Sequence, residues 1–281
     1  MNFVNIPKET PHGVAHRTFF SSLVNQGVGY NIYLPPDYDK TNKKYPVMYW
    51  LHGRGGNESS DIWVTEHIKK YNADTADAAQ MIIVFVNGTE ASGYRDSLNG
   101  SLPIESVIIT ELLPHIDSTY KTIKEQTGRI IEGFSMGGNG ALYYAVKYPE
   151  LFCSVVTYAG AFSGGSVRAD DGSYLEWEAV SDLFPERFET LYRKDPILAE
   201  QATVYYWITK NADVIRRDLK IRIVCGALDF LFDRNEILNK YLDKSNIPHE
   251  YEILQDIDHS IGKLYEISGA RGLCFHNNNL K

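Results

Sequence analysis

The sequence predicts an α/β fold with a mostly parallel central sheet, formed as a single domain over residues 1–281. Short apolar runs alternate along the chain with segments of helical spacing, which is the pattern of repeated strand–helix–strand units. Several runs are almost continuously apolar, as strands buried on both faces are. The chain of 281 residues is also long enough to bury a large core in one domain.

Seven segments have the composition of strands. The run 45–53, YPVMYWLHG, is almost entirely apolar and predicts a buried strand. The segment 249–255, HEYEILQ, alternates between apolar and polar residues and predicts the last strand. The predicted strands are 29–35, 45–53, 81–88, 128–135, 152–160, 220–229 and 249–255.

Helical segments separate these strands. We predict helices over 104–120, 136–149 and 234–246, with a kink or break in the first at Pro114. The stretch 161–218 is longer than one crossover connection needs, and we predict a helical insertion there. Two interpretations of the insertion remain open, either additional packing helices or a partial lid over a site.

The charge balance and composition exclude some classes of partner. The net charge of −8 and the pI of about 5.5 argue against nucleic acid, because phosphate binding needs a basic surface. No apolar run is long enough for a membrane span, and the N-terminus lacks the pattern of a signal peptide. Cys153, Cys225 and Cys274 are far apart, which fits neither a disulfide framework nor a metal site. We predict a cytoplasmic protein.

The pentapeptide GFSMG at 133–137 fits the pattern G-x-S-x-G of a nucleophile elbow. It follows an apolar strand and precedes a helical segment, as the elbow requires. The pattern predicts Ser135 as a nucleophile on a tight turn, with Gly133 and Gly137 giving room where any Cβ would clash. A phosphate loop is excluded because no lysine follows these glycines, and the dinucleotide pattern G-x-G-x-x-G is absent.

A nucleophilic serine needs a histidine as its base, and in this arrangement the histidine comes last in the chain. The candidates are His249, His259 and His276. His249 begins the last predicted strand, at the wrong end of the sheet. His276 lies in a predicted tail. His259 follows the last strand in the loop DIDHSIG, and we predict it as the base.

The third group is an acid that orients the base. Asp229 ends the segment IRIVCGALD and precedes His259 in the chain, so we predict it as the acid. Asp233 is the alternative. Asp256 and Asp258 are so close to His259 in sequence that they rarely reach back to its Nδ1.

Acyl transfer also needs two hydrogen-bond donors for the oxyanion. We predict the backbone N–H of Met136, directly after the nucleophile, as the first donor. The loop LHGRGGN at 51–57 predicts the N–H of Arg54 as the second, with Gly55 as the alternative. His52 in this loop is predicted to be structural.

Taken together, these segments resemble the putative-esterase family of α/β-hydrolases, which includes esterase D and bacterial feruloyl and acetyl esterases. The resemblance rests on YNIYLPPDYDKTNKKYPVMYWLHGRGGNE, ELLPHIDSTYKT, GRIIEGFSMGGNGALYYAVKYPELF and IVCGALD, covering most of 29–160 and then 221–260. It implies an α/β-hydrolase fold and a serine esterase without metal or cofactor, acting on a small-molecule ester. It implies the same triad, Ser135, Asp229 and His259.

The sequence departs from parts of this family. Members that cleave plant-wall aryl esters often have glycine before the histidine and tryptophan after it, whereas the run here is QDIDHSIGKLYE. Formylglutathione hydrolases have a histidine where this chain has Asn139, so a small thioester is an alternative substrate. An acyl acceptor other than water, and a non-catalytic binding scaffold, are further alternatives.

Overall fold

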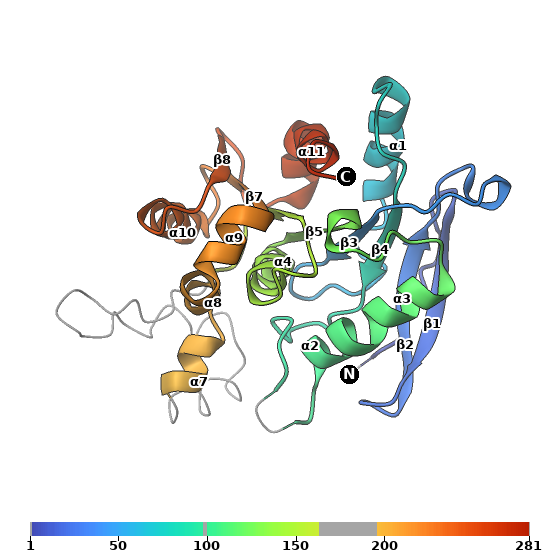
Figure 1. Cartoon of the computed structure of the whole chain (residues 1–281), viewed down its shortest axis with the longest axis horizontal. Helices are drawn as coiled ribbons and strands as arrows, with labels where there is room; N and C mark the ends of the chain where they lie inside the picture. Colours follow the sequence, from blue (N-terminus) through green and yellow to red (C-terminus); the bar gives the residue numbers. More distant parts are fainter. Residues whose placement is uncertain (1, 98–99, 163–195, 281) are drawn as a thin grey trace.

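The computed structural model describes residues 2–97, 100–162 and 196–280, and its centre is an eight-stranded sheet (Figure 1). The strand order is β1-β2-β4-β3-β5-β6-β7-β8. β2 is antiparallel to both β1 and β4, and every other neighbouring pair is parallel. The strands are β1 (Val14–Ser21), β2 (Gln26–Tyr33), β3 (Val47–Leu51), β4 (Ile82–Val86), β5 (Arg129–Phe134), β6 (Ser154–Tyr158), β7 (Lys220–Gly226) and β8 (His249–Leu254).

The mostly parallel sheet confirms the predicted α/β fold class. Each of the seven predicted strands is present, from β2 to β8. β1 is an additional strand at the sheet edge, where it pairs along its whole length with β2. The central strands β3 to β6 are buried on both faces, because helices cover each side.

Helices cover the two faces of the sheet in separate groups. The α-helices among the described residues are α1 (Val64–Asp74), α2 (Ile104–Ser106), α3 (Leu113–Thr119), α4 (Met136–Lys147), α7 (Pro196–Gln201), α8 (Val204–Lys210), α9 (Ala212–Asp218), α10 (Phe232–Lys244) and α11 (Ile261–Asn277). Figure 1 shows α1 and α11 on one side of the sheet and α4, α8 and α9 on the other.

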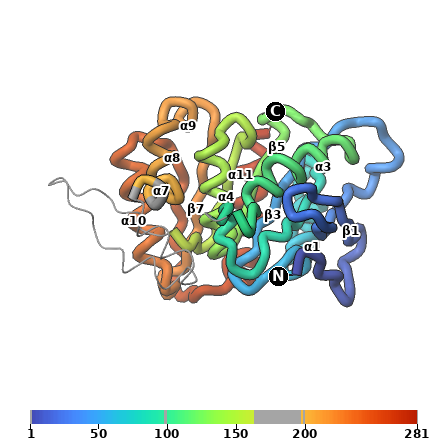
Figure 2. Tube along the Cα trace, turned by 90° about the horizontal axis from the view of Figure 1, so that it is seen from below, coloured from blue at the N-terminus to red at the C-terminus, as the bar shows by residue number. Residues whose placement is uncertain are grey.

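Alternation along each strand divides the core between these faces. On β3, Met48 and Trp50 belong to the core under α1 and α11, whereas Val47, Tyr49 and Leu51 belong to the core under α4. This period of two is what a strand buried on both faces produces. Figure 2 shows the sheet edges from below, with β1 at one end of the molecule and α10 at the other.

The helix prediction for 104–120 needs one correction. The segment is helical as far as Thr119: it begins as α2, continues as a π-helix over Val107–Leu112 and then becomes α3. Pro114 does not end the helix, which continues through α3 to Thr119; it lies directly after the π-helical turn that replaces regular α-helical bonding before it. In the predicted insertion, α7, α8 and α9 confirm helices within 196–218, and 163–195 lies outside the described residues.

Candidate active site

Ser135 lies at the turn between β5 and α4. Its backbone has φ 56° and ψ −116°, a conformation that residues other than glycine rarely adopt. Three hydrogen bonds fix it there: the Ser135 N–H donates to Tyr158 O at 2.9 Å, and Ser135 O accepts from the N–H groups of Asn139 and Ala161. The strained turn is therefore held by the end of β6 and by the first turn of α4.

The glycines on either side of Ser135 are required by contact with backbone atoms. A Cβ on Gly133 would lie 2.3 Å from Gly137 O, and one on Gly137 would lie 2.0 Å from Leu51 O. Neither backbone can move aside, because each belongs to the tight strand–turn–helix unit or to β3. Gly133 and Gly137 thus allow α4 to start directly above the ends of β3 and β5.

His259 and Asp229 complete a chain of hydrogen bonds from Ser135. Ser135 Oγ lies 3.0 Å from His259 Nε2, and His259 Nδ1 lies 2.8 Å from Asp229 Oδ2. Asp229 Oδ1 accepts a 2.8 Å bond from the N–H of Leu231, so both carboxylate oxygens have partners. A carboxylate can only accept, so Nδ1 carries the proton and Nε2 is left to accept the hydroxyl proton of Ser135.

The loops that hold the acid and the histidine are joined through their backbones. Leu228 N donates to Ile257 O at 3.0 Å, and Ala227 N donates to Leu254 O at 2.9 Å. Gly226 permits this approach, because a Cβ there would lie 2.2 Å from Ile257 O. These bonds explain how residues 30 positions apart in the chain meet.

The alternative residues lie outside the hydrogen-bonded chain of Ser135, His259 and Asp229. Asp233 is exposed in the first turn of α10, and Asp258 is exposed and pairs with Lys263. His249 begins β8, as predicted. The prediction that His276 lies in a tail is wrong, because α11 continues to Asn277 and His276 is completely buried in it.

A cavity of about 450 Å³ opens above Ser135. Its walls include both predicted oxyanion donors, Met136 and Arg54, together with His259. The amide of Gly55, the alternative donor, is already bonded to Glu90 O at 2.7 Å. The cavity is lined by Gly53, Arg54, Gly55, Gly93, Phe134, Ser135, Met136, Asn139, Ala161, Phe230 and His259.

His52 supports this loop from beneath. Its Nδ1 donates to Gly53 O at 2.8 Å, and its Nε2 accepts from the N–H of Gly88 at 3.1 Å. Burial lowers the pKa of His52 to about 4, so the ring is neutral near pH 7. With both nitrogens bonded to backbone, His52 connects the loop after β3 to the end of β4.

A second serine–histidine–carboxylate group is buried beneath α11. Ser154 Oγ lies 2.6 Å from His276 Nδ1, and His276 Nε2 lies 3.2 Å from Glu132 Oε1. The last pair is close enough for an ion pair, although it is not aligned as a hydrogen bond. All three side chains are fully buried, so no ester can reach this serine.

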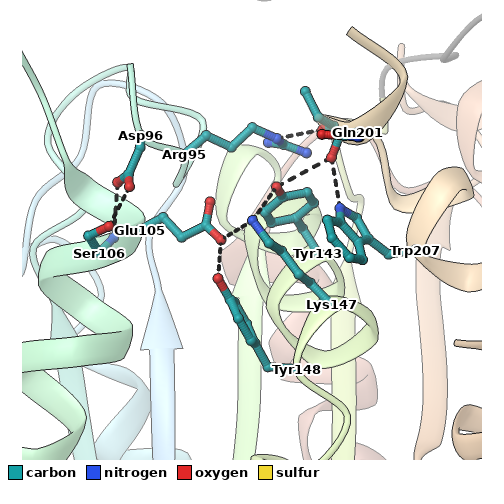
Figure 3. A pocket seen from close by; sticks show the side chains of 10 residues that line it. Arg95, Asp96, Glu105, Ser106, Tyr143, Lys147, Tyr148, Gln201 and Trp207 are labelled. Atoms are coloured by element: carbon teal, nitrogen blue, oxygen red, sulfur yellow. Dashed lines mark hydrogen bonds and ion pairs between the residues drawn. The ribbon is translucent and has the colours of Figure 1, made fainter. Parts of the chain in front are cut away.

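Figure 3 shows a second cavity, of about 230 Å³, between α2, α4 and α8. Glu105 there pairs with Lys147 and accepts a 2.6 Å hydrogen bond from Tyr148, and Asp96 accepts hydrogen bonds from Ser106. Both carboxylates are therefore bonded within the protein. The polar groups around this cavity bond to one another and join neighbouring helices. The cavity over Ser135 is instead lined by the predicted nucleophile and base, Ser135 and His259.

Comparison with known proteins places this geometry in a family. The model of the putative esterase family matches residues 21–260. The chain belongs to the putative esterase family. The family is named for esterase activity. None of the helices in the described ranges has the length and apolar content to cross a bilayer.

Individual relatives agree with the family assignment. The chain is 34% identical over 166 residues to an esterase of Mycobacterium tuberculosis (strain CDC 1551 / Oshkosh), an alignment that covers 58% of this chain and 35% of the relative. The chain thus spans about a third of that relative.

Solved structures confirm the α/β-hydrolase fold. A ferulic acid esterase superimposes with a TM-score of 0.77 at 25% identity, covering 95% of this chain and 98% of its own. An S-formylglutathione hydrolase from Agrobacterium tumefaciens gives a TM-score of 0.76 at 17% identity, covering 98% and 99%. The second likeness shows the shared fold alone.

Two contributors to the site are absent from the sequence predictions. Phe134 and Phe230 line the cavity and pack against His259. Each is the immediate neighbour of a predicted triad residue, and that adjacency is the only signal in the sequence that could have indicated them.

Proposed function

We propose that this chain is a serine carboxylesterase that forms an acyl-enzyme on Ser135. The observation that carries the proposal is the continuous hydrogen-bonded chain from Ser135 through His259 to the buried Asp229. This series of hydrogen bonds ends at a cavity large enough for a small ester. The order of serine, acid and histidine along the sequence is that of the α/β-hydrolases.

In the first half of the reaction, Ser135 Oγ attacks the ester carbonyl while His259 Nε2 takes the hydroxyl proton. Asp229 stabilises the imidazolium that forms and keeps its Nε2 directed at Ser135. The amides of Met136 and Arg54 donate to the oxyanion, and the N-terminus of α4 adds its positive dipole end. His259 then protonates the alkoxide that leaves.

In the second half, His259 removes a proton from a water molecule that attacks the acyl-enzyme. The tetrahedral intermediate uses the same donors, and its collapse returns the proton to Ser135 and releases the acid. Apart from the attacking water, every step of this mechanism uses groups of this chain.

The substrate class follows from the cavity walls. Phe134, Met136, Ala161 and Phe230 provide apolar surface, and the glycines at 53, 55 and 93 add no side chains to the lining. These walls suit a small or aryl ester of the acetyl or feruloyl type. The likeness to a ferulic acid esterase supports this choice.

The test replaces Ser135 with alanine. We expect hydrolysis of 4-nitrophenyl acetate by Ser135→Ala to fall by about 10⁴-fold or more, since removing the nucleophile disables the whole triad. Ser154→Ala is a matched control, because Ser154 also bonds to a histidine but is buried away from the cavity. Turnover by pure Ser135→Ala near the wild-type rate would refute the proposal.

Labelling with a fluorophosphonate probe tests the same serine independently of the substrate. Mass spectrometry should locate the label on Ser135 in the wild type and find none in Ser135→Ala. If the folded wild-type protein neither takes the label nor hydrolyses any ester, the scaffold serves binding only. Parallel assays with a thioester, and with an added alcohol as acceptor, measure whether either competes with an oxygen ester and water.

A further inference from the structure

Two phenylalanine rings pack against the imidazole of His259. The ring of Phe134 lies 4.6 Å from the imidazole, between centroids, with an interplanar angle of 32°. The ring of Phe230 lies 4.4 Å away, with an angle of 55°. Phe134 precedes Ser135 and Phe230 follows Asp229, so each of the other two triad positions brings its own ring to the histidine.

The two rings differ in their support. Phe134 is half-buried at the end of β5, and it packs so closely on the loop after β3 that a Cβ on Gly53 would lie 3.0 Å from its ring. Phe230 is 70% exposed, although it lines the cavity. Leu228, on the other side of Asp229, is 66% exposed but does not line the cavity.

We propose that Phe230 has two roles at this site: it positions His259, and it binds the apolar group of the ester that enters the cavity. The proposal rests on the function proposed above. It assigns to one residue both the orientation of the base and part of the substrate specificity.

The positioning role follows from what the hydrogen bonds leave free. The bond from Nδ1 to Asp229 holds one edge of the imidazole, but it leaves the ring able to tilt about that contact. Ring contacts at 4.4 Å and 4.6 Å oppose such a tilt. Loss of the Phe230 ring would therefore broaden the range of distances between His259 Nε2 and Ser135 Oγ, and small misplacements of this kind slow acyl transfer.

The binding role follows from the exposed fraction of Phe230. An exposed ring beside a reactive cavity is a surface that a ligand can cover, and its burial drives binding in proportion to the apolar area removed from water. The occupant must lie within reach of Ser135, because Phe230 and Ser135 line the same cavity. The apolar alcohol or acyl group of the ester meets this condition.

The experiment compares three variants on three esters in a pH-stat. The variants are Phe230→Ala, Phe230→Tyr and Leu228→Ala, the last being a matched loss of an exposed apolar side chain from the same loop. The esters are ethyl acetate, which has no ring, phenyl acetate, with a ring on the alcohol side, and ethyl cinnamate, with a ring on the acyl side. Thermal unfolding checks that each variant is folded.

On ethyl acetate, Phe230→Ala should lower kcat about three- to tenfold, the size expected from losing one aromatic contact. On the aryl ester that covers Phe230, KM should in addition rise about tenfold. Phe230→Tyr should keep kcat and KM near the wild-type values, because it keeps the ring. Leu228→Ala should change neither kcat nor KM.

Three results would overturn the proposal in separate ways. An unchanged kcat on ethyl acetate for Phe230→Ala removes the positioning role. An unchanged KM on both aryl esters removes the binding role. Equal effects from Leu228→Ala and Phe230→Ala show a general effect of the loop. These results differ from failure of the proposed function, in which the wild type itself would hydrolyse none of the esters.

Discussion

Replacement of His276 by alanine tests whether the buried histidine under α11 is structural. The change removes the partner of Ser154 and leaves the carboxylate of Glu132 buried beneath α11. Leaving a buried polar group without its partner costs about 1–3 kcal/mol, and here both Ser154 and Glu132 lose a neighbour. At roughly 2–4 °C for each kcal/mol in a large domain, the midpoint of thermal unfolding should fall by about 10 °C.

The assay measures urea unfolding and ester hydrolysis on the same preparation of His276→Ala. Turnover per folded molecule should stay near the wild-type value, because His276 has no access to the cavity over Ser135. His249→Ala is the matched control; its ring bonds to Asn239 and to Ile247 O at the sheet edge, so a smaller loss of stability is expected.

A double-mutant cycle sharpens the measurement. If Glu132 and His276 interact, Glu132→Gln combined with His276→Ala should destabilise the fold by less than the sum of the two single changes. Loss of ester hydrolysis by His276→Ala with unchanged stability would refute the structural role.

Two further predictions concern the pH dependence of stability and the elbow glycines. The pKa of His52 is about 4 in the folded protein and near 6.5 when unfolded, so the unfolded chain binds the extra proton between these values and stability falls as the pH drops through this window. Between pH 7 and pH 4.5 this loss is about 2 kcal/mol, and urea titrations should show His52→Gln without that component. Gly137→Ala should prevent folding, because its Cβ would lie 2.0 Å from Leu51 O, whereas Gly27→Ala, whose Cβ meets nothing within 4 Å, should fold normally. Recovery of a soluble, active Gly137→Ala protein with wild-type stability would contradict the packing described here.

Runs of apolar residues made the parallel strands predictable, since a strand buried on both faces must be apolar at nearly every position. β1 was not predicted, because its sequence VAHRTFFS has no regular alternation of apolar and polar residues. It forms a hairpin with β2 across the turn at 22–25, and the turn residues SLVN include no glycine or proline that would signal a turn.

α11 was not predicted because its glycines lower helix propensity. In the structure those glycines make room for close packing: a Cβ on Gly272 would lie 2.5 Å from the Tyr158 hydroxyl, and one on Gly269 would lie 2.7 Å from the Tyr265 ring. Tertiary contact therefore outweighs propensity here. The misplacement of His276 in a tail followed directly from missing this helix.

The sequence indicated the three triad residues better than it indicated the contacts around them. The elbow pattern and chain order indicated Ser135, Asp229 and His259, and the structure brings these three within hydrogen-bonding distance. The contacts of Phe134 and Phe230 with His259 depend on the folded loops, so no spacing rule announces them.

The backbone bonds that join the Asp229 and His259 loops have a consequence for redesign. Ala227 and Leu228 donate through their amides to carbonyls at Leu254 and Ile257, so the connection does not depend on which side chains these positions carry. Side chains on the loops that carry Asp229 and His259 can therefore be exchanged by loop grafting, while the acid and the base keep their positions relative to each other. Gly226 is the position such grafts must keep, since any side chain there would push the two loops apart.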